Sequence, residues 1–290
     1  METIFQESKE LAARAGAALE KIRRTRPLIH HITNAVTIDD SANIVLCLGA
    51  LPVMAQAPEE VAEMVSAAGA LVLNIGTLAR EQVEAMVIAG RQANKLGKPV
   101  VLDPVGAGAT VMRTEAARRI LAEVKVAVLR GNAAEIKAVA GAGGKIRGVE
   151  SLEEDAQITV QARDFARQLG MVVAITGKTD VITDGQITYL VDNGDPMLRT
   201  VVGTGCMSTS LIGAFCAVEQ DHAFAAAAGL VAMGLAGERA AGHTVAPGPP
   251  GDGLPAWPGE IGPGTFKMRL FDEIYHLSSE MIEAGARIRK

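Results

Sequence analysis

The chain has 290 residues, 49% of them apolar but only 3% aromatic, so its core must consist mainly of small and aliphatic side chains. A formal net charge of −5 and an isoelectric point of about 5.6 argue against a nucleic-acid partner, because that function needs a basic face. Cys47, Cys206 and Cys216 have no CxxC or cysteine–histidine spacing, which argues against a zinc site and favours reduced thiols.

The N-terminal half alternates between helical and strand patterns. Residues 2–22 have helical composition, with Glu and Lys scattered through them and no secretory signal pattern, so we expect a cytoplasmic protein. Apolar runs of strand length then alternate with helical segments at residues 28–32, 40–49, 70–74, 78–95 and 99–103. This alternation predicts a parallel sheet with crossover helices.

The loop at residues 33–37 follows the first strand. In open α/β sheets the ligand lies at the carboxyl ends of the strands, so Asn34 and Val36 are candidates for touching a substrate. His30 and His31 are adjacent within the strand and therefore face opposite sides of the sheet. They cannot both ligate one metal ion, and a structural role is favoured.

A second polar strand end occurs at residues 99–108, where an apolar run ends in Asp103 and a Gly-rich loop follows. Asp103 should lie at the ligand edge of the sheet, where an acid can hold Mg²⁺ or water. The simpler alternative is that an Asp before Pro only stabilises a turn.

The pattern repeats at residues 126–135, where a strand leads into a helix that Asn132 can cap. Arg130, at the strand end, is placed to meet phosphate oxygens. Glu135 either completes a capping box with Asn132 or directs its carboxylate to a metal ion beside Asp103.

The second half adds a strand at 171–178 and a hairpin whose turn is Asp184-Gly185. Residues 140–148 and 247–263 are rich in glycine or in both proline and glycine, and we expect them to be loops. Apolar residues spaced along 266–281 predict one closing helix. We find no internal domain boundary, so the expected architecture is a single α/β domain over 1–290, with a mostly parallel central sheet and helices on both faces.

Residues 201–218 are the segment around which the chain is organised. Gly203 and Gly205 allow a tight turn, and the small and apolar residues after them predict a helix whose first N–H groups bind an anion. Cys206 would lie in the first turn, where the positive helix end should lower its pKa towards neutrality. One alternative is a buried helix with a glycine turn. Another is a membrane hairpin formed with residues 224–237, but both runs are too rich in Gly, Ala, Ser or Thr, and two packed core helices fit better.

Taken together, these motifs resemble the hydroxyethylthiazole kinase family, which belongs to the ribokinase-like kinases. The resemblance extends over nearly the whole chain, in the right order, through His30-His31-Ile32-Thr33-Asn34, Pro52-Val53-Met54-Ala55, Leu102-Asp103-Pro104-Val105-Gly106-Ala107-Gly108, Arg130-Gly131-Asn132-Ala133-Ala134-Glu135, Ile175-Thr176-Gly177, Gly203-Thr204-Gly205-Cys206 and Gly262-Pro263-Gly264-Thr265-Phe266. It implies a ribokinase-like fold and phosphorylation of the primary alcohol of 4-methyl-5-(2-hydroxyethyl)thiazole by ATP, for thiamine salvage. It also implies a homotrimer with substrate pockets between subunits.

The resemblance implies roles for individual residues. Met54 and Gly203 would contact the thiazole, with Met54 and Asn34 available to complete a neighbouring subunit's site. Arg130 and Thr176 would hold ATP, and Asp103 and Glu135 would serve Mg²⁺.

At Cys206 the wider superfamily usually has Asp, whereas the thiazole kinases have Cys. We expect Cys206 to accept the alcohol proton late in the reaction, while the N–H groups from Gly203 through Gly205 to Cys206 hold the transferred phosphoryl group.

Three alternative functions remain from the sequence. One is a related kinase of a pyrimidine or pyridoxal alcohol, against which Cys206 counts. Another is a cysteine hydrolase with Cys206 as nucleophile and His30 or His31 as base. The third is a nucleotide sensor without catalysis. We expect a small-molecule partner and neither nucleic acid nor a membrane.

Overall fold

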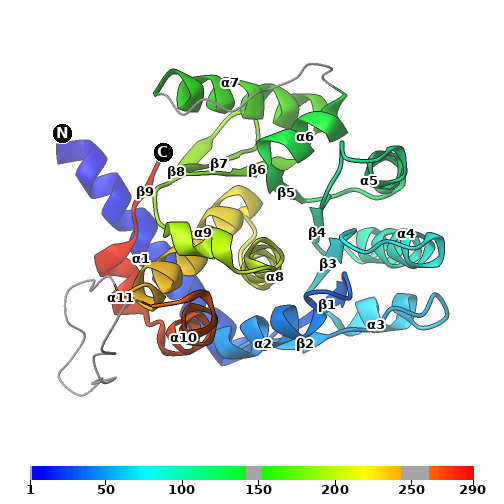
Figure 1. Cartoon of the computed structure of the whole chain (residues 1–290), viewed down its shortest axis with the longest axis horizontal. Helices are drawn as coiled ribbons and strands as arrows, with labels where there is room; N and C mark the ends of the chain where they lie inside the picture. Colours follow the sequence, from blue (N-terminus) through cyan, green and yellow to red (C-terminus); the bar gives the residue numbers. More distant parts are fainter. Residues whose placement is uncertain (1, 142–151, 243–260) are drawn as a thin grey trace.

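The computed structural model describes residues 2–141, 152–242 and 261–290, and within them the strands form one curved sheet (Figure 1). The strand order is β2-β1-β3-β4-β5-β6-β7-β8-β9. Neighbours from β2 to β6 pair in parallel, and β7, β8 and β9 are added antiparallel. The strands are β1 (Leu28–Ile32), β2 (Leu51–Val53), β3 (Ala70–Asn74), β4 (Val100–Asp103), β5 (Val128–Asn132), β6 (Val172–Thr176), β7 (Asp180–Thr183), β8 (Thr188–Val191) and β9 (Ile288–Arg289).

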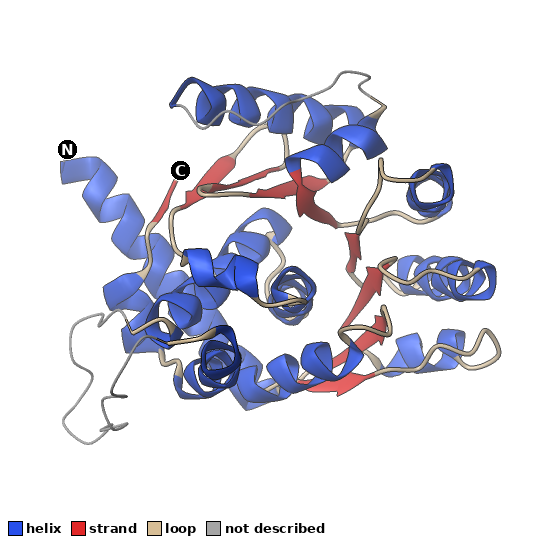
Figure 2. Ribbon diagram, in the orientation of Figure 1, coloured by secondary structure: helices blue, strands red, loops and turns tan. Residues whose placement is uncertain are grey.

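Helices cover both faces of this sheet, as Figure 2 shows. One face carries α3 (Val61–Ala67), α4 (Arg80–Lys95), α5 (Val111–Glu123), α6 (Ala133–Ala140) and α7 (Leu152–Leu169). The other face carries α1 (Glu2–Thr25), α2 (Ile38–Leu48), α8 (Thr204–Cys216), α9 (His222–Ala240), α10 (Pro263–His276) and α11 (Ser279–Gly285), with the short 3-10 helix η1 (Pro196–Thr200) before α8. The expected mostly parallel sheet between two helical layers is confirmed.

Strand β3 shows how the sequence produces two cores. All five of its residues are buried, which is typical of a parallel strand covered on both faces. Successive side chains point to opposite faces, so Val72 joins the cluster under α8 and α9 while Leu71 and Leu73 join the cluster under α3 to α7. A continuous apolar run is therefore required here rather than an alternating one.

Small residues let α8 pack closely on the sheet and let α9 pack closely on α8. A Cβ on Gly213 would lie 2.4 Å from Cγ2 of Val72, and one on Gly229 would lie 3.0 Å from the backbone of Ile212. Among the described residues, α9 alone has the length and hydropathy of a membrane span, and 94% of its apolar window is buried inside the fold. The prediction of two packed core helices is confirmed.

Some local expectations differ from the structure. Helix α5 is not predicted, because its buried residues Ala116, Ala117 and Ile120 form only a narrow apolar stripe. The single closing helix is wrong. Leu277 leaves the helical conformation, and Ser278 then caps the separate helix α11.

The loop predicted at 247–263 lies mostly outside the described residues, and Pro263 already belongs to α10. Most of the loop predicted at 140–148 also lies outside them.

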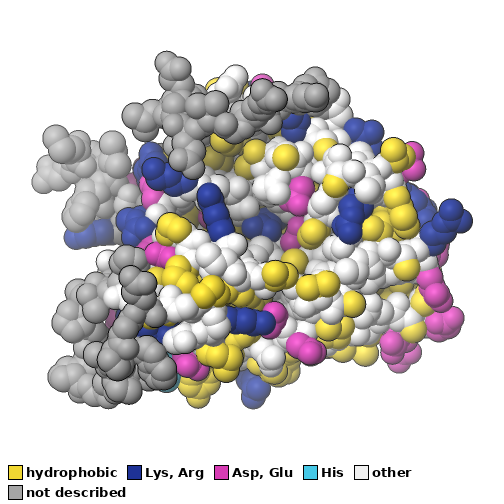
Figure 3. Space-filling model, viewed as in Figure 1, with side chains coloured by type: hydrophobic (Ala, Val, Ile, Leu, Met, Phe, Trp, Pro, Cys, Tyr) yellow, Lys and Arg dark blue, Asp and Glu magenta, His cyan; other side chains and the backbone are white. Residues whose placement is uncertain are grey.

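The visible surface carries charges of both signs. On the face shown in Figure 3, Lys and Arg side chains lie interspersed with Asp and Glu. This differs from the continuous basic face that is typical of nucleic-acid binding.

Candidate functional site

A cavity of about 420 Å³ lies where β1, β3, β4, β5 and β6 end and α8 begins. Its position at the carboxyl ends of parallel strands is the usual ligand site of open α/β sheets. Every residue to which the kinase interpretation gives a site role, except Met54, lines it. The lining residues are Asn34, Val36, Thr37, Gly76, Thr77, Asp103, Val105, Arg130, Asn132, Glu135, Thr176, Val202, Gly203, Gly205 and Cys206.

Asp103, the last residue of β4, is 1% exposed. Its Oδ2 accepts hydrogen bonds from Thr209 Oγ1 at 2.8 Å and from Asn74 Nδ2 at 3.1 Å, and lies 3.6 Å from Arg130 Nη1. Its Oδ1 is buried and has no partner among the described residues. Burial raises the pKa of Asp103 to about 6, although Arg130 opposes the shift. The unpartnered oxygen is available to a ligand.

Arg130, from β5, lines the cavity. Its Nη2 donates to Thr176 Oγ1 at 2.9 Å, and its buried Nε has no partner in the described parts of the chain. A Cβ on Gly205 would lie 2.8 Å from Arg130 Nη1, so only glycine lets the first turn of α8 approach the guanidinium this closely. The free N–H and the positive charge suit a phosphate oxygen.

Glu135 forms the capping box with Asn132 that was one of its two expected roles. Its Oε2 accepts from the backbone N–H of Asn132 at 2.9 Å, and Asn132 Oδ1 accepts from the N–H of Glu135 at 2.9 Å. Its Oε1 accepts from the N–H of Gly106 at 2.8 Å. Each oxygen retains a lone pair, and Glu135 is close enough to Asp103 to raise the pKa of that acid further.

These two carboxylates fit a magnesium ion. Within the described residues no group of three or more His, Cys, Asp or Glu could hold a metal. Mg²⁺ usually takes one or two carboxylates and completes its shell with phosphate oxygens and water. The unpartnered Oδ1 of Asp103 and the carboxylate of Glu135, which line the same cavity, match that chemistry.

The glycine turn before α8 is confirmed in detail. Gly203 caps the helix with a φ of 95°, which favours glycine, and a Cβ there would lie 2.7 Å from Cγ2 of Thr37. Helix α8 begins at Thr204, so Gly205 already belongs to the first turn of the helix rather than to the turn before it. Its first backbone N–H groups have no acceptor within the helix and lie at the cavity.

The predicted lowering of the Cys206 pKa is wrong. Burial is the largest cause that raises the pKa of this thiol, and the nearby carboxylate of Asp103 raises it further. Hydrogen bonds from Thr37, Asn74 and Asn34 oppose the shift without reversing it. The resting side chain is therefore a neutral thiol.

The loop after β1 is fixed by Asn34, which is 3% exposed. Its Oδ1 accepts from the backbone N–H groups of Val36 and Thr37, both at 3.1 Å. Val36 and Val202 line the cavity and are 64% and 71% exposed, so they form an apolar rim.

Three residues that the sequence analysis singled out do not line this cavity. His30 and His31 are both 0% exposed, and burial lowers the pKa of each, to about 4 for His31. His30 Nε2 is bonded to the carbonyl of Ala55 at 2.8 Å. Met54 is half-buried beyond the end of the edge strand β2. The histidine base required by the hydrolase alternative is thus not in the cavity with Cys206.

Sequence reasoning missed several polar residues around the cavity, namely Thr37, Asn74, Thr77, Arg113 and Thr209. Asn74 has a recognisable signal, since it is the polar end of a buried apolar strand and pairs in register with Asp103. The other residues lie in loops or helices whose orientation the pattern does not fix.

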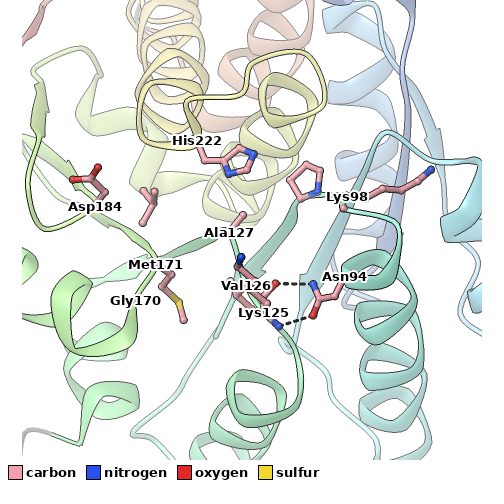
Figure 4. Close-up of a pocket in the computed structure, with 12 residues that line it drawn as sticks. Asn94, Lys98, Lys125, Val126, Ala127, Gly170, Met171, Asp184 and His222 are labelled. Carbon is pink, nitrogen blue, oxygen red and sulfur yellow. Dashed lines mark hydrogen bonds between the residues drawn. The ribbon is translucent and has the colours of Figure 1, made fainter.

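A second cavity, of about 380 Å³, lies at the opposite edge of the sheet (Figure 4). Asn94 bonds the backbone of Lys125 through both ends of its amide, at 2.8 and 2.6 Å. Lys98 Nζ donates to two backbone carbonyls, and Asp184 Oδ1 accepts two backbone N–H groups of its own turn. These groups are already satisfied, so the cavity at the carboxyl edge is the better candidate.

Comparisons with known proteins point to one family. A model described as the hydroxyethylthiazole kinase family matches residues 19–280. A hydroxyethylthiazole kinase from Chloroflexus aurantiacus is 53% identical over 269 residues, which cover 93% of this chain and 94% of that protein.

Solved structures give the same picture. The structure of a hydroxyethylthiazole kinase protein from Pyrococcus horikoshii has a TM-score of 0.82 and 39% identity, covering 95% of this chain and 98% of that one. A pyridoxal kinase from Staphylococcus aureus, in complex with AMP-PCP and pyridoxal, has a TM-score of 0.54 and 17% identity, covering 71% of this chain and 85% of that one. The latter shows a shared fold only.

Proposed function

The chain belongs to the hydroxyethylthiazole kinase family, and on that premise we propose that it transfers the γ-phosphoryl group of ATP to the primary alcohol of 4-methyl-5-(2-hydroxyethyl)thiazole, a step of thiamine salvage. One observation carries the proposal. A single cavity brings the start of α8, Arg130 and two carboxylates to the same place as Cys206. Phosphoryl transfer needs this combination of anion binding, charge neutralisation and alignment.

The nucleotide lies along the β5 and β6 side of the cavity in this proposal. Arg130 binds phosphate oxygens through its unpartnered Nε, and Thr176 fixes the other end of the guanidinium. Gly205 and the N–H groups beside it bind the phosphoryl group in transfer.

Asp103 and Glu135 are the residues that would hold Mg²⁺. When bound, the ion neutralises charge on the phosphates of ATP. The chain's own contribution is the direction of the Asp103 carboxylate, whose Oδ2 is held by Thr209 and Asn74 while Oδ1 stays free.

The alcohol lies between Cys206 and the loop after β1. Asn34 and Gly203 border this part of the cavity, and Val36 offers apolar surface to the thiazole ring. Because the resting thiol is neutral, Cys206 acts by orienting the hydroxyl group rather than by removing its proton first. The proton leaves late, as the loose transition state of phosphoryl transfer permits, and passes to an oxygen of the transferred phosphoryl group.

Assembly would bring Met54 to the substrate. We propose a cytoplasmic homotrimer in which Met54, at the open edge of the sheet, completes the cavity of a neighbouring subunit. The three unpaired cysteines are compatible with a reducing compartment. Mixing Met54→Arg with the weakly active Cys206→Ala variant should raise activity above that of either alone, because some interfaces then combine two intact halves. No recovery, in a mixture shown to exchange subunits, would contradict the shared site.

The direct test is incubation with Mg-ATP and the thiazole alcohol, followed by mass spectrometry for the phosphate ester. Pyridoxal and a hydroxymethylpyrimidine serve as competing substrates. We expect the highest kcat/KM for the thiazole. Turnover of another alcohol only, or ATP binding without any ester, would replace this proposal by the related kinase or by the nucleotide sensor.

A further inference from the structure

Asn74 has no assigned role, yet it connects the two halves of the candidate site. It is the last residue of β3, is 1% exposed and is absent from the cavity wall. Its Nδ2 donates to Asp103 Oδ2 at 3.1 Å. Its Oδ1 accepts from Asn34 Nδ2 at 2.9 Å and from the N–H of Gly76 at 2.9 Å. Every polar atom of this side chain thus has a defined partner.

The hydrogen-bond pattern fixes the orientation of both amides. The Asp103 carboxylate accepts from Thr209 and lies beside Arg130, so Asn74 must present its NH₂ group there and its carbonyl to Asn34. Asn34 must then present its own NH₂ group to Asn74, because its carbonyl already accepts two backbone N–H groups. Rotating either amide by 180° would oppose two oxygens.

The same chain of bonds reaches the thiol. Asn34 Nδ2 also lies 3.4 Å from Cys206 Sγ, and Asn74 is itself among the hydrogen-bond partners of that side chain. A Cβ on Gly76 would lie 2.9 Å from Asn34, so the loop bonded to Asn74 packs directly against the same amide. Moving Asn74 would therefore disturb the acid and the thiol together.

We propose that Asn74 is a positioning residue for phosphoryl transfer, holding the Asp103 carboxylate and the Cys206 thiol in a fixed mutual orientation through Asn34. The inference rests on the proposed function, since it concerns alignment of the phosphate end with the alcohol end. Small losses of alignment reduce turnover more than binding. Asn74 should accordingly affect kcat more than KM.

The test is a double-mutant cycle on the full chain, with kcat and KM measured for ATP and the thiazole alcohol. Asn74→Ala should lower kcat about 10- to 100-fold, the range for losing hydrogen bonds to a charged group, and change KM for ATP less than about 3-fold. In a Cys206→Ala background the same change should cost several-fold less, because residues acting as one unit are not additive and only the effect on Asp103 is then left.

The matched control is Asn94→Ala, which removes an amide also bonded at both ends, but at the opposite edge of the sheet. Its kcat should stay within about twofold of the unmodified protein. If Asn74→Ala does not fold, Asn74→Ser keeps one bonding hydroxyl and enters the same cycle. Equal losses in both Cys206 backgrounds, or kinetics like those of Asn94→Ala, would overturn the inference alone. Absence of turnover by the unmodified protein would overturn the proposed function and the inference with it.

Discussion

Cavities of similar volume lie at the two ends of the parallel strands, about 420 Å³ at their carboxyl ends (the carboxyl edge) and about 380 Å³ at their amino ends (the amino edge). At the amino edge, Asn94, Lys98 and Asp184 bind the protein's own backbone. At the carboxyl edge, Asp103 Oδ1 and Arg130 Nε are buried without partners among the described residues. Volume therefore does not distinguish the two cavities. Buried polar groups left for a ligand do, because an unsatisfied group is costly unless something binds it.

The largest test of this contrast exchanges one acid at each edge for its amide. Asp103→Asn removes the charge at the free Oδ1 and should lower kcat by about 10³-fold, within the range for losing one electrostatic contact in a transition state. Asp184→Asn keeps an oxygen for the backbone N–H groups of its turn and should change kcat less than about twofold. Steady-state kinetics at saturating Mg-ATP measures both. A comparable loss in the two variants would remove the functional distinction between the edges.

A second test uses two cysteines on helix α8. Cys206→Ala should lower kcat about 10²-fold, the lower end of the range for a positioned catalytic group. Cys206→Asp should keep or raise activity, since a carboxylate can both orient the hydroxyl and accept its proton. Cys216 is buried beyond the reach of the cavity, and Cys216→Ala should leave kcat unchanged while lowering the melting temperature.

Mass spectrometry separates this role of Cys206 from covalent catalysis. A phosphorylated or acylated cysteine in the trapped enzyme, together with an inactive Cys206→Asp variant that still binds Mg-ATP, would make the thiol a nucleophile. We expect no such adduct.

The third test is the pH dependence of kcat/KM for ATP. Burial raises the pKa of Asp103 to about 6, and the reactive form is the ionised one, so activity is present above that pH and lost as the pH falls through it. At pH 5 the free enzyme should retain roughly a tenth of its activity at pH 7. An acid limb near pH 4 instead would show that Asp103 titrates like an exposed carboxyl group. Asp103→Asn should abolish the limb at pH 6 in its residual activity.

Sequence patterns could predict the strand ends but not what surrounds them. Asp103 and Arg130 each end a short buried apolar run, and such runs stop where the chain reaches the ligand edge of the sheet. The pKa of Cys206 could not be predicted, because it depends on burial and on groups as distant as Asn34, which is 172 residues away in the chain. Asn74 could have been suspected from its position, but Asn is equally common in turns. Met54 stays a prediction, since the role proposed for it needs a second subunit.

The smallest expected effect concerns Arg113, which joins two loops of the functional cavity. Its Nη1 donates to the carbonyls of Ile75 at 3.1 Å and Val105 at 2.8 Å, and its Nη2 to that of Gly76 at 2.7 Å. A Lys ammonium cannot reproduce this planar fork. Arg113→Lys should therefore loosen both loops and raise KM about 3- to 10-fold, with kcat reduced less.

Arg118 on the same helix is the matched control. It donates to two carbonyls of α6, those of Ala138 at 2.8 Å and Val139 at 3.4 Å, and it does not line the cavity. Arg118→Lys and Arg113→Lys should each lower the free energy of unfolding by about 1 kcal/mol, but Arg118→Lys should not change KM. Chemical denaturation and steady-state kinetics on both variants separate the two effects. Arg113→Lys could instead lose stability but keep its KM. The loops at the carboxyl edge would then hold their shape without the Arg113 hydrogen bonds, and the cavity would be organised by Asp103 and Arg130 alone.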